Sequence, residues 1–142
     1  MVSAKDCLKK YGPATPDNPN LVLWDVPSDL EVGVIPKRIY CNRDLITPLS
    51  GAFRALIISG HVSELQTWDG CFNIRNVRGK NSPSLHSWGI AIDLNARTNG
   101  MGTAGDMDPQ IVALFEDYGF VWGGRWSGTN KDPMHFQYCS GY

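Results

Sequence analysis

SLHSWGIAID, residues 84–93, joins a histidine and a carboxylate to a run of strand-forming residues. Side chains alternate between the two faces of an extended strand, so Ile90, Ile92 and Leu94 are predicted to point together toward the core. Two small residues share the opposite face with Asp93. A buried carboxylate is costly unless it is paired or binds a metal, so this face is predicted to keep room for a ligand beside Asp93.

His86 lies seven residues before Asp93, a separation of roughly 23 Å in a fully extended chain. Ligands of one metal ion lie only ~2 Å from it, so the chain has to turn between these two residues if both bind the same ion. Gly89 is the expected position of the turn, because glycine adopts backbone conformations that are closed to other residues.

The segment from Met134 to Tyr138 is predicted to be the closing strand, with His135 and Gln137 on its polar face. Asp132 precedes Pro133, which favours an extended backbone at Asp132. Such a backbone would place the Asp132 carboxylate beside a metal ion or other group bound by His135. Two histidines and one aspartate, with a fourth position open to water, match the ligand count of a catalytic zinc, whose bound water has its pKa lowered to about 7. The Asp132 carboxylate would then be the general base.

Each of these residues also fits a structural role. A histidine on a strand is often a hydrogen-bonded structural residue, and Asp132 fits a turn in the sequence Asn-Lys-Asp-Pro. His61 follows the expected end of a helix and fits a surface position, but it remains a candidate to replace one ligand. On spacing alone, metal binding and structural roles both stay open.

Length and composition predict one soluble globular domain over residues 1–142. The chain is 42% hydrophobic and 19% charged with a formal net charge of −1, which gives no electrostatic reason to expect binding to nucleic acid or to an anionic membrane. No stretch approaches the ~20 apolar residues of a membrane span, and the first residues lack the apolar run of a signal peptide. We therefore expect no membrane insertion, and a protein that stays in the cytoplasm unless another factor releases it.

The four cysteines, Cys7, Cys41, Cys71 and Cys139, form no C-x-x-C pair, so neither a zinc ribbon nor a redox motif is supported. Buried free thiols are the simpler expectation. Two disulfides remain open if the protein works outside the cytoplasm.

The longest helix is predicted over residues 45–58, where apolar residues recur at three- and four-residue steps, with Pro48 in the first turn and Gly60 as a C-cap. A second helix is predicted to begin after Asp108 as N-cap and to end before Gly119. A short helix is expected over 4–10, a surface loop over 27–40 with Val34, Ile35 and Ile39 reaching the core, and a mobile loop over 95–105. Strands are expected over 21–24, 71–75, 89–94, 120–123 and 134–138. Their irregular alternation predicts an α+β fold with a small antiparallel sheet packed against helices.

Three motifs follow one another along the second half of the chain: SxHxxGxAxD at 84–93, GFxWGGxW at 119–126 and DxxHF at 132–136. Together they resemble the signature of the zinc D-alanyl-D-alanine carboxypeptidases and the phage L-alanyl-D-glutamate endopeptidases, whose fold is shared with the Hedgehog signalling domain. The resemblance is close from Gly70 onward. It implies a small antiparallel sheet that carries a zinc site.

The resemblance implies that zinc is bound by His86, Asp93 and His135, with Asp132 as the catalytic carboxylate. Many relatives have glutamate at this last position, so the shorter aspartate favours the phage endopeptidase branch. Arg75 resembles the arginine that binds the substrate carbonyl and stabilises the developing oxyanion.

Three further residues are candidates for contact with the substrate. Arg78 remains an alternative to Arg75. Ser84 matches a serine that holds substrate in relatives, although a loop hydroxyl can equally cap a turn. Trp126 is a candidate for the floor of the substrate cleft, although a tryptophan is a core residue by default.

The resemblance therefore implies a zinc metallopeptidase that hydrolyses peptide bonds in the peptidoglycan stem, cutting between L-Ala and D-Glu as a phage endolysin. A D-alanyl-D-alanine carboxypeptidase or dipeptidase and a non-hydrolytic zinc module that binds peptidoglycan remain the alternatives. From the habit of the family we expect a monomeric catalytic domain without a separate wall-binding domain. It would wait in the host cytoplasm until a holin-type partner gives it access to the periplasmic peptidoglycan.

Overall fold

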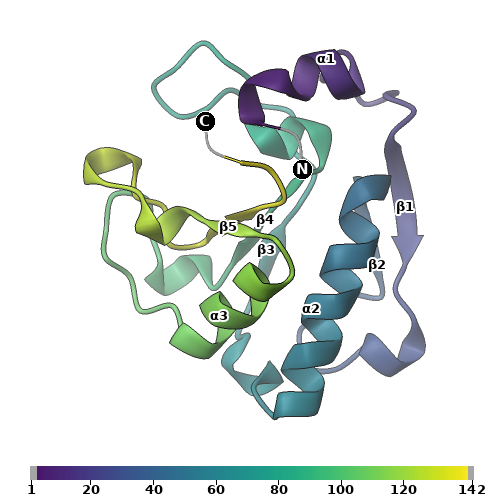
Figure 1. Cartoon of the computed structure of the whole chain (residues 1–142), viewed down its shortest axis with the longest axis vertical. Helices are drawn as coiled ribbons and strands as arrows, with labels where there is room; N and C mark the ends of the chain where they lie inside the picture. The colour runs from purple at the N-terminus through teal and green to yellow at the C-terminus, as the bar shows by residue number, and fades with distance from the viewer. Residues whose placement is uncertain (1–2, 141–142) are drawn as a thin grey trace.

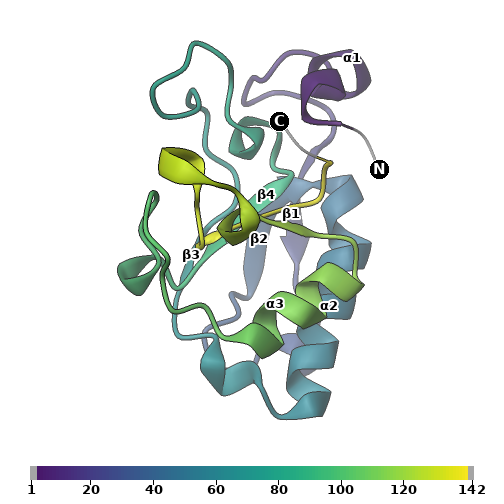
Figure 2. The same cartoon turned by 60° about the vertical axis from the view of Figure 1, so that its left-hand side comes forward.

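The computed structural model describes residues 3–140, which form two small antiparallel sheets and three α-helices around one hydrophobic core (Figure 1). Helices α2 and α3 lie side by side, whereas the short helix α1 lies at the opposite end of the molecule in both views (Figure 2). The predicted α+β class, with an antiparallel sheet packed against helices, is confirmed.

The N-terminal part holds the smaller sheet. The 3-10 turn Ala4–Asp6 leads into α1, Cys7–Tyr11, and strand β1, Leu21–Asp25, pairs with β2, Arg38–Asn42. The surface loop expected over 27–40 is therefore wrong at its end, because β2 begins at Arg38 and the buried Ile39, between exposed Arg38 and Tyr40, pairs against β1. Val34 is also exposed rather than packed in the core.

Helix α2, Ile46–Ser59, matches the strongest helical pattern of the sequence. Its buried face is made by Leu49, Ala52, Phe53 and Leu56. Pro48 lies in the first turn, where its missing N–H costs nothing, and Gly60 ends the helix in the left-handed conformation with φ 79°. The 3-10 turns Arg43–Leu45 and Val62–Glu64 flank this helix.

The larger sheet has the strand order β3-β4-β6-β5, and all of its pairs are antiparallel. Its strands are β3, Trp68–Gly70; β4, Ala91–Leu94; β5, Val121–Trp122; and β6, His135–Gln137. The strand predicted over 71–75 is wrong, because Trp68 and Gly70 form the pairing with β4 and the chain leaves the sheet at Cys71. This departure leaves the Cys71 carbonyl free to face the His86 side chain instead of a neighbouring strand.

Helix α3, Pro109–Asp117, begins as the sequence predicts, with Asp108 accepting a hydrogen bond from the Gln110 N–H at 2.7 Å. Phe115 joins the helix to the sheet, because its ring lies 5.0 Å from that of Phe136 in β6. The remaining 3-10 turns are Leu85–Trp88, Ala96–Thr98, Gly123–Arg125 and Gly128–Asn130. The sheet that carries Asp93 and His135 is thus braced by a well-packed helix.

All four cysteines are buried free thiols, as the simpler expectation had it. The Sγ atoms of Cys7 and Cys139 lie 3.9 Å apart, and the Ala4 N–H donates to the Ser140 carbonyl at 3.0 Å, so the two ends of the described chain meet. No helix within residues 3–140 has the length and apolar character needed to span a bilayer.

Candidate metal centre

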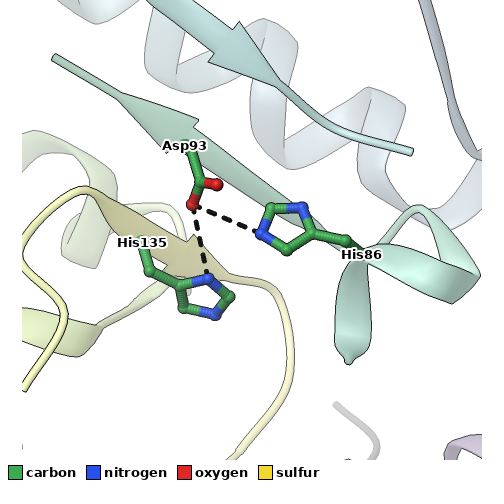
Figure 3. Close-up of side chains that lie close together, drawn as sticks. All are labelled: His86, Asp93 and His135. Atoms are coloured by element: carbon green, nitrogen blue, oxygen red, sulfur yellow. Dashed lines mark ion pairs between the residues drawn. The ribbon is translucent and has the colours of Figure 1, made fainter. Parts of the chain in front are cut away.

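Three predicted ligands from three separate elements converge in one place (Figure 3). His86 comes from the turn Leu85–Trp88, Asp93 from β4 and His135 from β6. The Asp93 Oδ1 atom lies 3.3 Å from His86 Nε2 and 3.5 Å from His135 Nδ1. One ligand atom from each residue lies within 4.8 Å of the others, which is close enough for all three to bind a single ion.

The register of the sheet places two of these side chains together. Asp93 in β4 is the cross-strand partner of His135 in β6, and residues directly opposite one another in an antiparallel pair project from the same face. A shift of the register by one residue would turn either side chain to the opposite face. The pairing of β4 with β6 therefore fixes two thirds of the centre.

The third ligand is brought in by the turn that the sequence predicts at Gly89. Gly89 has φ 63°, in the left-handed region, and a Cβ atom there would lie 2.7 Å from the Asn42 backbone nitrogen. Glycine is required at this position both for its backbone conformation and for the close approach of β2. The Ser84 hydroxyl caps the start of the turn by accepting from the His86 N–H at 3.3 Å.

Hydrogen bonds on the outer side of each imidazole select the nitrogen that faces Asp93. His86 Nδ1 lies 2.7 Å from the Cys71 carbonyl, which can only accept, so this nitrogen carries the proton and Nε2 is left bare. Gln137 donates from Nε2 to the Cys139 carbonyl, and its Oε1 lies 2.9 Å from His135 Nε2. This arrangement assigns the His135 proton to Nε2 and leaves Nδ1 bare.

Buried polar atoms without a partner mark the same point. Among the described residues, His86 Nε2, Asp93 Oδ1 and Asp132 Oδ1 are buried and form no hydrogen bond. A buried polar atom left without a partner costs about 1–3 kcal/mol, so three of them together indicate a site that binds a ligand. Two bare imidazole nitrogens beside a carboxylate fit zinc, which takes nitrogen and oxygen ligands of this kind.

The carboxylates of the centre have pKa values shifted in opposite directions. In the metal-free protein, burial by itself raises the pKa of Asp93, but His135 and His86, when they carry a proton on the nitrogen that faces Asp93, lower it well below its usual range and keep this group charged. Burial raises the pKa of Asp132, opposed by His135 and reinforced by the charge of Asp93. A carboxyl with a raised pKa lies nearer the working pH of an enzyme and is better suited to accept and return a proton.

Almost all the predicted functional residues line one cavity of about 310 Å³ above the ligands. Its lining includes Arg75, Arg78, Ser84, Asp93, Trp126, Asp132 and His135. His86 lines an adjoining cavity of about 300 Å³ that shares Arg75 and Asp93 with the first. His61 lies beyond the end of α2 and is not part of the ligand group found within the described residues.

Arg75 is exposed, but its backbone is tied to the histidine-bearing turn. Its carbonyl accepts from the Ser84 N–H at 2.8 Å and from the Ser87 hydroxyl at 3.0 Å. Arg75 lines both cavities, whereas Arg78 lines only the first. This placement favours Arg75 as the cation nearest the ligands.

The two nearby tryptophans of the second motif have different environments. The Trp126 ring lies 5.5 Å from the His135 ring and lines the cavity. Trp122 packs against the core, and its indole N–H donates to the Pro133 carbonyl at 2.7 Å. Ser84 is only 2% exposed and, besides capping the turn, contributes to the cavity lining.

Sequence reasoning missed the two groups that orient the histidines. The role of Gln137 could have been predicted, because strand alternation puts its side chain on the same face as His135. The role of the Cys71 carbonyl could not, because it is a backbone atom whose position depends on where β3 ends.

Comparison with known proteins gives a family match to the second half of the chain. Residues 78–138 match the sequence model of a family described as D-alanyl-D-alanine carboxypeptidase. The matched span is less than half of the 142-residue chain; it contains His86, Asp93, Asp132 and His135, but not Arg75. No curated protein matches the chain. The match supports a peptidase related to enzymes that act on D-alanyl-D-alanine, and the His-Asp-His group supplies a possible metal site for it.

Proposed function

We propose that this protein is a zinc metallopeptidase that hydrolyses the L-alanyl-D-glutamate bond of the peptidoglycan stem and serves as a phage endolysin. The observation that carries the catalytic part of the proposal is the position of Asp132. Asp132, whose buried Oδ1 atom has no partner, lines the same cavity as Asp93 and His135, and His86 lines the adjoining cavity. The choice of bond rests on the resemblance to the phage enzymes, including the aspartate at position 132.

His86, Asp93 and His135 would hold the metal. Zinc, when bound in such a site, supplies Lewis acidity, which polarises a carbonyl and makes water a stronger acid. Asp132 would accept a proton from the attacking water and return it to the leaving amine. Arg75, which lines the cavity, would stabilise the negative charge that develops on the carbonyl oxygen.

Two features favour an enzyme over a module that only binds peptidoglycan. A structural zinc site is normally closed by a fourth protein ligand, and within the described residues the metal-binding group has three members. A structural site also needs neither a carboxylate like Asp132 nor a cation like Arg75 beside it.

The D-alanyl-D-alanine carboxypeptidase reaction is the second candidate, because the matching family bears that description. Both reactions use the same residues, and they differ in which peptide bond reaches the centre. The identity of the released product therefore decides between them.

The test is to incubate purified peptidoglycan with the zinc-loaded protein, with and without a chelator, and to identify the products by mass spectrometry. New D-glutamate amino termini support the endopeptidase, and free D-alanine supports the carboxypeptidase. The absence of any product from a sample shown to contain zinc would overturn both in favour of a binding module.

The endolysin role is tested in cells. We propose that the monomeric protein is held in the cytoplasm of a Gram-negative host and reaches the periplasmic peptidoglycan through a lesion made by a holin-type partner. The support for this step is the resemblance to phage endopeptidases. Expression alone should leave the culture turbid, and coexpression with a pore-forming holin should cause lysis. Equal lysis in both cultures would contradict the need for a partner.

A further inference from the structure

The cleft continues past the candidate metal centre into a second cavity of about 420 Å³, which we name the distal pocket. Val77, Met101 and Trp126 line both the distal pocket and the cavity above the ligands, so the two cavities adjoin. Lys80 and Arg125 are the charged residues that the distal pocket adds. A substrate that crosses the centre can therefore extend into a positively charged pocket.

Arg125 is already neutralised. Its Nε and Nη2 atoms donate to the two carboxylate oxygens of Glu116 at 2.6 and 2.7 Å, and its guanidinium lies 5.7 Å from the centre of the Trp122 ring. Such a two-pronged ion pair satisfies most of the charge and fixes the side chain. Arg125 thus shapes the pocket wall and leaves little charge for a ligand.

Lys80 differs from Arg125 in having no carboxylate partner. Within residues 3–140 it forms no ion pair, and it is exposed on a short loop that borders the distal pocket and also a cavity beside α1. Hydrogen bonds from the Val77 N–H to the Ser82 carbonyl at 2.8 Å and from the Lys80 N–H to the Val77 carbonyl at 2.9 Å close this loop. The ammonium group is therefore attached to a defined turn and is available to an anion.

The cavity that contains His86 has a different charge from the distal pocket. The adjoining cavity that contains His86 is lined by Asp69 and Asp93 as well as by Arg75. The distal pocket, in contrast, has no carboxylate among its described lining residues. A peptide with an uncharged half and an anionic half would be oriented by this difference, with its anionic half toward Lys80.

The peptidoglycan stem has that asymmetry around the proposed scissile bond. L-alanine on the acyl side carries no side-chain charge, whereas D-glutamate on the leaving side carries a free α-carboxylate because its chain continues through the γ-carboxyl. We propose that the distal pocket binds the carboxylate-bearing leaving portion of the stem peptide, and that Lys80 is the specificity-determining cation. This inference rests on the proposed peptidase function and assigns a direction to its substrate.

The test compares two stem peptides that differ in one charge: L-Ala-D-Glu-diaminopimelate with a free α-carboxylate on D-glutamate, and the same peptide with that group amidated. With the zinc-loaded protein, the KM for the amide should exceed that for the acid by about three- to tenfold, as expected for a charge pair at a partly solvated site. In Lys80→Ala this ratio should fall to about one, and in Lys80→Glu it should invert. Lys37→Ala, at an exposed site outside the cleft lining, should keep the ratio of the unaltered protein.

The outcomes separate this inference from the function on which it rests. Cleavage of both peptides with the same ratio in Lys80→Ala as in the unaltered protein would overturn the role of Lys80 and leave the peptidase intact. If neither peptide is cleaved, the proposed function fails, and the dissociation constants of the two peptides measured by calorimetry still test the pocket. Equal dissociation constants for acid and amide would then overturn the pocket as well.

Discussion

The two sides of the cleft are built in different ways. On one side, which we call the metal wall, His86, Asp93 and His135 project from paired strands and a capped turn, and both histidines are at least 97% buried. On the other, the cationic wall, Arg75, Arg78 and Lys80 project from exposed irregular backbone over residues 75–80.

The difference follows from how accurately each task needs its atoms placed. Metal ligands must lie within about 0.2 Å of their ideal distances, which demands a fixed register and oriented rings. A cation stabilises an anion over several ångströms, and a long side chain adjusts its own reach. We therefore expect substitutions on the metal wall to abolish activity and those on the cationic wall to reduce it by degrees.

The largest effect is expected from Asp93→Asn. Asp93 lies between the two histidines and supplies the only negative charge of the ligand group, which an amide cannot replace. Zinc content measured by mass spectrometry should fall close to zero, and peptidase activity should fall below detection. Asp69→Asn, a carboxylate in the same cleft that is hydrogen-bonded to Thr67, is the matched control for zinc retention. Full zinc occupancy in Asp93→Asn would show that zinc binding does not need the Asp93 carboxylate and would contradict the metal wall as defined here.

Asp132→Ala tests the carboxylate that lies between the two walls. Its turnover should fall by about 10²–10⁴-fold, the usual contribution of a general acid-base group, while its zinc content stays at the level of the unaltered protein. Both quantities are measured on the same preparation. Loss of zinc in this variant would show that Asp132 is a ligand and belongs to the metal wall.

On the cationic wall, Arg75→Ala should lower kcat by about 10²–10³-fold, because a donor aimed at the developing oxyanion is lost. Arg78→Ala should change kcat only a few-fold, since Arg78 lines the first cavity but not the one that holds His86. Steady-state kinetics of the two variants side by side provide the measurement. A larger loss in Arg78→Ala would exchange the two assignments.

Gln137→Leu tests the outer support of the metal wall without removing a ligand. Loss of the hydrogen bond to His135 Nε2 frees the imidazole to rotate and to change tautomer, so zinc affinity should fall by about ten- to a hundredfold. Competition with a chelator of known affinity measures the change. Unaltered affinity would mean that the strand pairing alone holds His135 in place.

The same contrast explains what the sequence could predict. The α2 and α3 helices and the turn at Gly89 follow from periodicity, capping and glycine placement, which are local signals. The ligand set of His86, Asp93 and His135 was implied by the resemblance of the motifs. Pairing partners are not local. The strand expected at 71–75 lies instead at Trp68–Gly70, and β2 was not foreseen, because each is defined by the strand that it pairs with.

The unforeseen parts of the site have the same cause. The Cys71 carbonyl orients His86 only because β3 ends one residue earlier, and no side-chain pattern reports the position of a carbonyl. Lys80 joins the cleft only because the loop over residues 77–82 folds beside Met101 and Trp126. Motifs located the chemistry, whereas long-range packing determined its surroundings.

The smallest effect is expected in the stability of the metal-free protein at low pH. The pKa of Asp93 lies below its unfolded value of about 3.9, so this group stabilises the fold above that pH and its contribution is lost as the pH falls further. Asp93→Asn should therefore flatten the pH dependence of unfolding below about pH 4, by about 1–2 kcal/mol between pH 5 and pH 2. Urea denaturation followed by tryptophan fluorescence measures it, with the exposed Asp117→Asn as control. An unchanged slope would mean that the histidines do not keep the Asp93 carboxylate charged when the metal is absent. The metal wall would then become ordered only when the ion binds.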